Sequence, residues 1–205
     1  MNKNIAIAIL VILYAVGVAG IRVFNIQNFI LLTPLNLLVC LSIVLFCHPK
    51  WTFYTVLTLL TAAFGGWAVE VYGVATDALF GSYRYGATLG WKYQNVPVAM
   101  GINWATTIYC VGILINHGFE RWHFVLKSTL GAAVAVSLDL LLEPVAMRYD
   151  FWQWQNNTVP TQNYLAWAVV SFIFLSIFNL LQGNIKNKVA IALLILQFTF
   201  FAILQ

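Results

Sequence analysis

Two carboxylates lie within an otherwise apolar stretch of the chain, the segment SLDLLLEPVAMRYDFWQWQ at positions 137–155. They are Asp139 and Glu143, which are four residues apart and therefore share one face of a helix. An acid within a membrane span costs about 2.5 to 3.5 kcal/mol, so such residues usually face a protein interior or a water-filled cavity. Pro144 follows Glu143 and would free backbone carbonyl groups at the same point. Two close carboxylates repel each other in apolar surroundings, so one is expected to stay protonated and act as a general acid, while the other orients or deprotonates water.

The composition around this pair is that of an integral membrane protein. Of 205 residues, 62% are apolar and 8% are charged, and the mean hydropathy is +0.87, far from the roughly one-quarter charged residues of soluble domains. The net charge of +4 is scattered along the chain, which argues against a nucleic-acid partner. The three cysteines show no CxxC spacing, and the only close histidines, His117 and His123, are spaced unlike ligands on a helix, so no metal site is expected.

Apolar runs of roughly 20 residues predict the transmembrane helices. We expect an all-α integral membrane protein with one transmembrane domain over residues 1–205 and about seven helices, at 5–21, 29–46, 52–72, 96–116, 124–147, 164–182 and 189–204. Two long polar-aromatic connections, 73–95 and 148–163, follow the third and fifth helices. A slight excess of Lys and Arg on the N-terminal side favours a cytoplasmic N-terminus in the cytoplasmic membrane.

This topology gathers the acids on one side. The third and fifth helices run in the same direction, so their final turns and both long connections share one face of the membrane. Five of the six acidic residues are therefore expected at that face: Glu70, Asp77, Asp139, Glu143 and Asp150.

Residues 67–105 and 139–168 are candidates for a parallel internal repeat. In both segments Glu is followed seven residues later by Asp, then by aromatic residues, then by Val-Pro, and Trp stands seven residues after that Pro. Such repeats often place a site at their interface. The two connections differ in length, so the duplication is a hypothesis.

The aromatic residues of these segments have two interpretations. Tryptophan and tyrosine near the ends of spans form ordinary interfacial belts. Trp67, however, shares a helix face with Glu70, and an electron-rich ring beside an acid would stabilise a positive charge formed on a substrate. Asn103 and Asn163 could hydrogen-bond a carboxyl group or a water molecule, or could simply join helices.

Other roles for the acids remain open. They could pair with Arg84, Lys92 or Arg148 and only fasten the connections. Intramembrane acids and repeats also occur in small-molecule and proton-coupled transporters. Against transport, these acids lie near one edge of the span, and no charged residue continues a path through the first, second, sixth or seventh helix. A retinal photoreceptor would need a lysine within residues 189–204, and there is none.

The motifs WAVEVYGVATDALFGSYRYG, NVPVAMGINW, DLLLEPVA, FWQW and VPTQNYLAW, which lie between residues 67 and 167, resemble those of the carotenoid biosynthesis membrane proteins of bacteria and archaea. That family includes carotenoid end-group hydratases. The resemblance implies addition of water to the terminal double bond of an acyclic carotenoid without a cofactor, in a lipid bilayer and alongside other carotenoid biosynthesis enzymes. The matching positions are Glu70, Asp77, Phe80, Gly81, Tyr83, Tyr85, Pro97, Asp139, Glu143, Pro144, Trp152, Trp154, Asn163 and Trp167.

Hydration of such an alkene begins with protonation to a tertiary carbocation, which needs an acid, cation-stabilising rings and one water. We expect the Asp139/Glu143 pair to deliver the proton and Glu70 or Asp77 to hold the water. The residues expected to bind the substrate and its cation are Trp67, Phe80, Tyr83, Tyr85, Asn103, Trp104, Trp152, Trp154, Asn163 and Trp167. Cyclisation of the end group begins with the same protonation, so a cyclase or a noncatalytic carotenoid-binding subunit remains an alternative.

Overall fold

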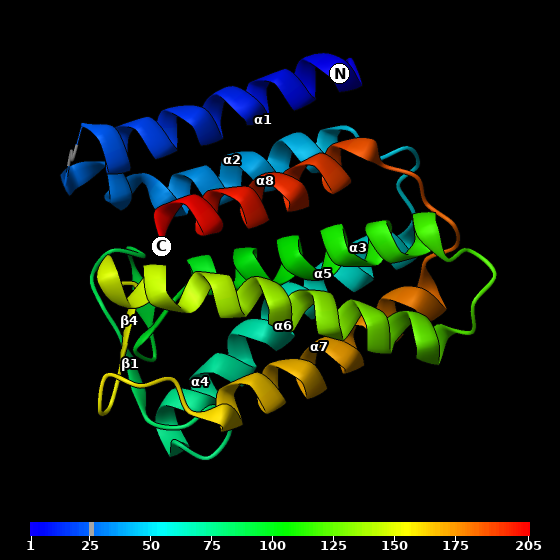
Figure 1. The fold of residues 1–205 in the computed structure, drawn as a ribbon. Helices are drawn as coiled ribbons and strands as arrows, with labels where there is room; N and C mark the ends of the chain where they lie inside the picture. Colours follow the sequence, from blue (N-terminus) through cyan, green and yellow to red (C-terminus); the bar gives the residue numbers. More distant parts are fainter. Residues whose placement is uncertain (25–26) are drawn as a thin grey trace.

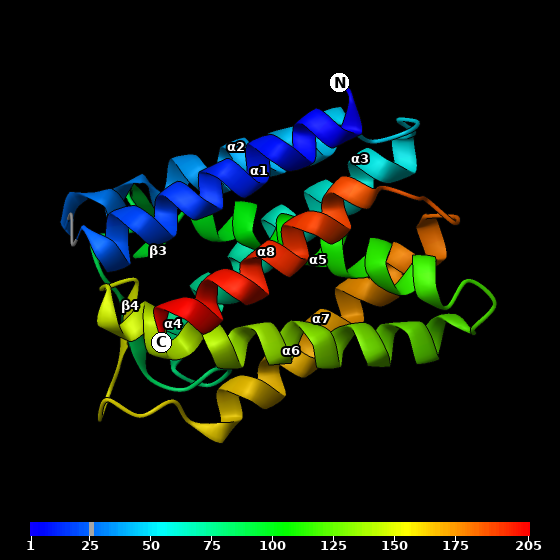
Figure 2. The same ribbon diagram turned by 45° about the horizontal axis from the view of Figure 1, so that its top comes forward.

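The computed structural model describes residues 1–24 and 27–205 and forms a bundle of helices (Figures 1 and 2). Its α-helices, in chain order, are α1 Lys3–Val18, α2 Thr33–Phe46, α3 Phe53–Leu60, α4 Gly66–Thr76, α5 Ala99–Gly118, α6 Phe124–Arg148, α7 Thr161–Leu181 and α8 Lys188–Leu204. Short π- or 3₁₀-helical turns extend or join some of them: η1 Ala19–Val23, η2 Gln27–Leu32 and η3 Thr61–Gly65.

The predicted all-α membrane architecture is confirmed. Six continuous helical segments are long and apolar enough to cross a bilayer: Lys3–Val23, Phe29–Phe46, Phe53–Thr76, Ala99–Gly118, Phe124–Arg148 and Thr161–Leu181. The seventh predicted span corresponds to α8, an apolar helix of 17 residues. At 1.5 Å per residue, α8 is roughly 25 Å long, close to the thickness of a hydrocarbon core.

Helix α5 forms the centre of the bundle. It contacts α2, α3, α4, α6, α7 and α8, and 15 of its 20 residues are buried. Figure 1 shows α1, α2 and α8 together above α5, with α4 and α7 on its other side. Figure 2 shows α8 lying between α1 and α6. Most side chains of α5 therefore pack against other helices rather than facing lipid.

A small sheet joins the two long connections, which were predicted only as loops. Strand β1 (Tyr83–Tyr85) pairs antiparallel with β4 (Trp152–Trp154), and Tyr83 lies opposite Trp154. Since side chains alternate across a strand, the four aromatic residues of the two strands face the core and are buried, whereas Arg84 is exposed. The alternating patterns YRY and WQW are the signal for these strands in the sequence.

The predicted start of the fourth span also differs from the structure. Val96–Pro97 forms β3, which pairs with β2 (Lys92–Tyr93), so α5 begins at Ala99 rather than at Val96. The chain before Pro97 is extended because the proline ring disfavours helical conformation in the preceding residue.

A buried polar cluster lies at the connection between α2 and α3, at the end of the bundle away from β1 and β4. The His48 ring lies 2.6 Å from the Tyr109 hydroxyl through Nδ1 and 2.9 Å from the Lys50 carbonyl through Nε2. Because a carbonyl oxygen only accepts, Nε2 carries the proton and Nδ1 accepts from Tyr109. The Asn187 amide also donates to the Tyr109 hydroxyl, at 3.2 Å. A neutral His48 thus links the α2–α3 connection to α5 and, through Asn187, to the start of α8.

Acidification is expected to destabilise the protein through His48. Burial lowers the pKa of His48, an effect that the Lys50 carbonyl partly opposes. The unfolded chain therefore binds this proton at a higher pH than the folded chain does, and the free energy of unfolding falls as the pH decreases below about 6.5. His48→Gln should reduce the difference in unfolding temperature between mildly alkaline and mildly acidic detergent solution.

His117→Gln is the matched control, because His117 is an exposed histidine of the same protein. It should retain the pH dependence of the unmodified chain. An unchanged pH dependence in His48→Gln would show that another group controls it.

Candidate active site

Glu70, on α4, is the first of three buried acids at the β1–β4 end of the bundle. It is only 3% exposed. The Tyr83 and Tyr85 hydroxyls donate to its Oε2, at 2.5 and 2.7 Å, and the Trp104 indole donates to Oε1 at 3.0 Å. Hydrogen bonds to a charged acceptor contribute about 1.5 to 3 kcal/mol each, and these three replace much of the hydration that Glu70 loses on burial.

Glu143, on α6, has a matching environment. The Trp152 and Trp154 indoles donate to its Oε2, at 2.9 and 2.8 Å, and the Asn163 amide donates to Oε1 at 3.1 Å. The register of β1 and β4 determines where these donors lie, because alternation along the strands points the side chains at positions 83, 85, 152 and 154 to the same side. Asn163 comes from the first turn of α7.

Asp139 lies beside Glu143, one helical turn earlier on α6, and is 1% exposed. The same Asn163 nitrogen that donates to Glu143 donates to Asp139 Oδ2, at 2.9 Å. Asp139 Oδ1 is buried, and in residues 1–24 and 27–205 it has no hydrogen-bond partner. One amide group thus bridges two carboxyl groups, an arrangement suited to a pair that shares a proton.

The basic residues near the acids bind other groups. Lys92 Nζ donates to the Tyr85 carbonyl at 2.6 Å, Arg148 donates to the Leu204 carbonyl at 2.8 Å, and Arg84 is exposed. Within residues 1–24 and 27–205, all seven hydrogen bonds to the three acids come from neutral donors. The structure therefore does not support the interpretation that the acids only fasten the connections through ion pairs.

The two tyrosines remain neutral donors over the ordinary pH range. Burial raises the pKa of Tyr83 above its ordinary value, and the adjacent Glu70 raises it further. Burial and then Glu70 raise the pKa of Tyr85 in the same way. Both hydroxyl groups therefore keep their protons and remain able to stabilise a negative charge on Glu70.

A small cavity separates Glu70 from Glu143. The volume open to the centre of a water molecule is about 10 Å³, which is close to the minimum for one water. Its wall contains both glutamates, four aromatic residues of β1 and β4, and four others: Phe80, Met100, Asn163 and Trp167. The Trp167 ring stacks on Trp104, with centroids 4.3 Å apart. The cavity therefore combines two acids, electron-rich rings and room for about one water.

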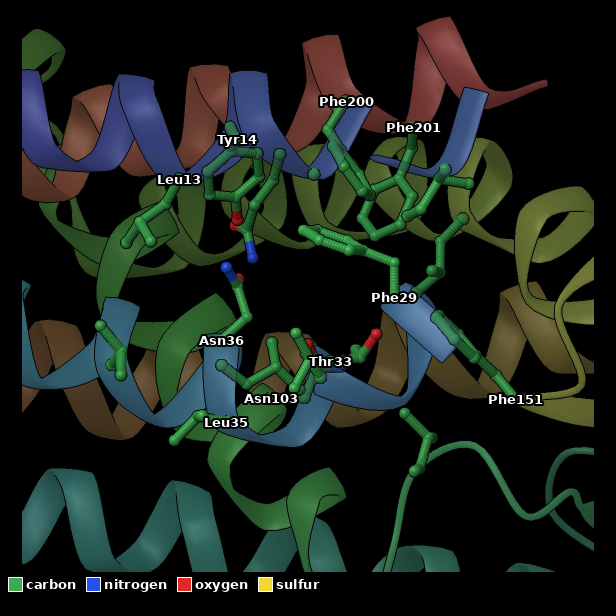
Figure 3. A pocket seen from close by; sticks show the side chains of 18 of the residues that line it. Leu13, Tyr14, Phe29, Thr33, Leu35, Asn36, Asn103, Phe151, Phe200 and Phe201 are labelled. Atoms are coloured by element: carbon green, nitrogen blue, oxygen red, sulfur yellow. The ribbon is translucent and has the colours of Figure 1, made fainter. Parts of the chain in front are cut away.

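A second, larger cavity adjoins the first. It has a volume of about 250 Å³ and lies between α1, η2, α2, α5 and α8, and Figure 3 shows the phenyl rings of Phe29, Phe200 and Phe201 gathered in its wall. Met100 and Trp152 line both cavities. At the rim, Val16, Leu32 and Leu35 are 50%, 49% and 56% exposed on the apolar outer surface. The larger cavity thus connects the membrane-facing surface with the wall of the acid site.

Most of the residues predicted for the site come together. Nine line the small cavity: Glu70, Phe80, Tyr83, Tyr85, Glu143, Trp152, Trp154, Asn163 and Trp167. Asp139 and Trp104 lie directly behind it, through their bonds to Asn163 and Glu70.

Three predicted residues lie elsewhere. Asp77 is exposed at the end of α4, in a left-handed conformation with φ of 56°. Trp67 stacks on Tyr93, with centroids 5.8 Å apart, and is not in the cavity wall. Asn103 lines the larger cavity. Met100 and the cavity walls from α1, α2 and α8 were not predicted, although polar residues within these apolar helices, such as Asn36 and Gln197, are a signal that could have indicated a site there.

Comparison with protein families gives one match. The model of a family described as carotenoid biosynthesis protein matches residues 29–205, which includes every acid and aromatic residue of the site. Comparison with curated proteins and with solved structures found no match.

Gly66→Ala is expected to disturb the site through Trp104. A Cβ at position 66 would lie 2.3 Å from Trp104 Cγ, and Trp104 is fully buried against Trp167. Overpacking of this kind destabilises proteins by about 1 to 3 kcal/mol. Thermal unfolding and near-ultraviolet circular dichroism of the purified protein in detergent should both change. Gly183→Ala, where a Cβ meets nothing within 4 Å, is the control, and equal unfolding temperatures for the two variants would contradict the expectation.

Proposed function

The chain belongs to the carotenoid biosynthesis protein family, and from this membership we propose that it is the enzyme that adds water to the terminal double bond of an acyclic carotenoid end group. The family gives it a role in carotenoid biosynthesis. The specific reaction is inferred from the acid site.

One observation carries the proposal: Glu70 and Glu143 line a cavity with room for about one water, and that cavity adjoins an apolar cavity open to the membrane-facing surface. A carotenoid is a membrane-soluble hydrocarbon, and its end group would enter past Val16, Leu32 and Leu35. Met100 and Trp152 form the wall where the end group would meet the acids. An apolar cleft with a few convergent polar groups is the usual form of a site for such a ligand.

The first step is proton transfer to the alkene. The Asp139–Glu143 pair carries one shared proton, and Glu143 delivers it because Glu143 lines the cavity. The proton adds to one carbon of the terminal double bond, the π bond breaks, and a tertiary carbocation forms at the other carbon. The electron-rich ring of Trp152, which lines both cavities, stabilises that cation.

The second step is capture of the cation by water. Glu70 holds the water, whose oxygen forms a C–O bond with the cation while one of its protons passes to Glu70. The product is a tertiary alcohol, and the proton returns from Glu70 to the Asp139–Glu143 pair through the next water that enters. Alkene and water are consumed in equal amounts, and the acids end in their starting states.

A cyclase would begin with the same protonation but capture the cation with another double bond of the substrate. The opposed glutamates favour hydration, because a water between them has both a hydrogen-bond partner and a proton acceptor. A cyclase site would instead need to exclude water from the cation.

Expression in a bacterial host that accumulates acyclic carotenoids tests this reaction. Chromatography and mass spectrometry of the pigments should show a product heavier by one water. A product of altered elution and unchanged mass would replace hydration with cyclisation, and unchanged pigments with several acyclic precursors would contradict an enzymatic role on this end group.

Neutral variants of the acids should stop product formation without unfolding the protein. Loss of general acid or base function typically lowers rates by about 10²- to 10⁴-fold, so Glu143→Gln and Glu70→Gln are each expected to lower the yield of hydrated product at least about 100-fold. Asp139→Asn should have an effect of the same kind, because it removes the partner with which Glu143 shares a proton.

Glu120→Gln is the matched control. Glu120 is an exposed acid in the α5–α6 connection, where it accepts a hydrogen bond from Asn184, and this variant should retain full activity. Elution volume in size-exclusion chromatography shows whether each variant is folded. If Glu143→Gln and Asp139→Asn both formed product normally, the assignment of the acid would be wrong.

A further inference from the structure

The two cavities share a wall but differ greatly in size. The larger cavity has a volume of about 250 Å³, whereas the small cavity between Glu70 and Glu143 has about 10 Å³, which is room for about one water. A terminal alkene carries methyl groups on its double-bonded carbon and is much larger than a water molecule. It therefore cannot reach Glu143 in the conformation that the structure describes, and part of the shared wall has to move.

Trp152 is one of two described residues that line both cavities, and it is held in place. Its indole donates to the buried Glu143 Oε2 at 2.9 Å. It also lies opposite Tyr85 in the β1–β4 register, and the two rings meet edge to face with centroids 6.0 Å apart. Rotation of the Trp152 ring would leave a buried carboxyl oxygen with one donor fewer, which is unfavourable.

Met100, the other shared residue, has no such restraint on its side chain. It lies in the first turn of α5 and is 3% exposed. Methionine is unbranched, with three rotatable bonds and a thioether that needs no hydrogen bond, so it repacks easily in irregular interior space. The backbone beneath it is fixed, because a Cβ on the neighbouring Gly101 would lie 2.9 Å from the Ala63 carbonyl oxygen. The Met100 side chain, rather than its helix, is therefore the part of the shared wall that is able to move.

We propose that the Met100 side chain is a movable partition between the two cavities, and that its size determines which end groups reach the acids. In the conformation of the structure it separates the space beside Glu70 and Glu143 from the larger cavity. Rotation about its side-chain bonds joins the cavities and gives an apolar group access to Glu143. The inference rests on the proposed function in taking Glu143 as the acid that an end group must meet, but the movement can be measured without a carotenoid.

Hydrophobic carbodiimides measure access to Glu143. They react with protonated carboxyl groups: the acid O–H adds across one C=N bond, and the resulting O-acylisourea rearranges to a stable N-acylurea that mass spectrometry locates in the sequence. The probes are diisopropylcarbodiimide and the larger dicyclohexylcarbodiimide, added to the purified protein in detergent. The unmodified protein should be labelled slowly at Glu143 by the smaller reagent. Met100→Ala should raise the rate for the larger reagent at least about tenfold, the discrimination that a hydrophobic pocket makes for a single methylene group.

The ratio of the two labelling rates distinguishes a partition from a general loosening of the fold, which would raise both rates together. Met147→Ala is the matched control, because Met147 is a half-buried methionine one helical turn after Glu143 on α6 and lies in the described wall of neither cavity. It should keep the ratio of the unmodified protein. Met100→Val removes less volume and should change the ratio in the same direction as Met100→Ala should the latter fail to fold.

Turnover gives a second measure of the same partition. The probes are an acyclic polyene with the ordinary terminal methyl groups and one in which an ethyl group replaces a terminal methyl group. The unmodified protein should convert the ethyl compound about tenfold more slowly, and Met100→Ala should remove most of this difference. A ratio of rates is unaffected by loss of folded protein.

Labelling and turnover together separate this inference from the proposed reaction. A labelling ratio that changes with Met100→Ala, with no gain of water in any acyclic precursor, would leave the partition standing and reject the hydratase. Hydration with a labelling ratio that is equal in the unmodified protein, Met100→Ala and Met100→Val would reject the partition alone. Absence of labelling at Glu143 by the smaller reagent in the unmodified protein would also overturn it.

Discussion

The site depends on hydrogen bonds from neutral side chains to carboxylates that lie within membrane-spanning helices. A buried carboxylate without such donors is strongly unfavourable, and the structure supplies three donors to Glu70 and three to Glu143. Four of those six donors come from β1 and β4. The pairing of two short strands outside the helices is therefore what allows the acids to remain inside them, and the antiparallel register of β1 and β4 places all four donors on one side.

Several features of the two halves of the site agree with the hypothesis of an internal repeat. Glu70 and Glu143 are each followed, seven residues later, by an aspartate with φ of 56° at which the chain leaves its helix. A three-residue strand then returns two aromatic donors to the glutamate, and the tryptophans that follow the two Val-Pro pairs stack on each other. A duplicated helix–strand–helix unit would explain why residues from both halves meet at one cavity, and this interpretation accounts for the geometry without requiring equal loop lengths.

The sequence predicted the membrane helices and the grouping of the acids because both follow from simple constraints. The length needed for a span sets the number of helices. Because successive spans run in opposite directions, the third and fifth end on the same side of the membrane, which places Glu70, Asp139 and Glu143 at the same end. The strands were missed because runs such as YRY and WQW are only three residues long, and their pairing partner lies about 70 residues away. The larger cavity was missed for a related reason: its wall comes from α1, α2, α5 and α8, and single polar residues within them, such as Asn36 and Gln197, do not show how these helices pack together. Asp77 was assigned to the site from its spacing after Glu70 and from the family resemblance, whereas the left-handed turn at that position directs the chain out of the helix and leaves the side chain exposed.

The differences between the two halves explain how similar acids could have opposite roles. Asp139 precedes Glu143 by four residues, and the residue at the equivalent position before Glu70 is Gly66, whose α-carbon lies against the Trp104 ring. Any side chain there would displace Trp104, so the first half holds a single carboxylate. In the second half, Asp139 occupies the corresponding position, and the Asn163 amide bridges the Asp139 and Glu143 carboxyl groups. Two close carboxyl groups in apolar surroundings favour retention of one proton, whereas Gly66 gives Glu70 no carboxyl group one helical turn earlier. In the proposed reaction, this difference between Gly66 and Asp139 is the feature that assigns proton donation to the Glu143 side of the cavity and proton acceptance to the Glu70 side.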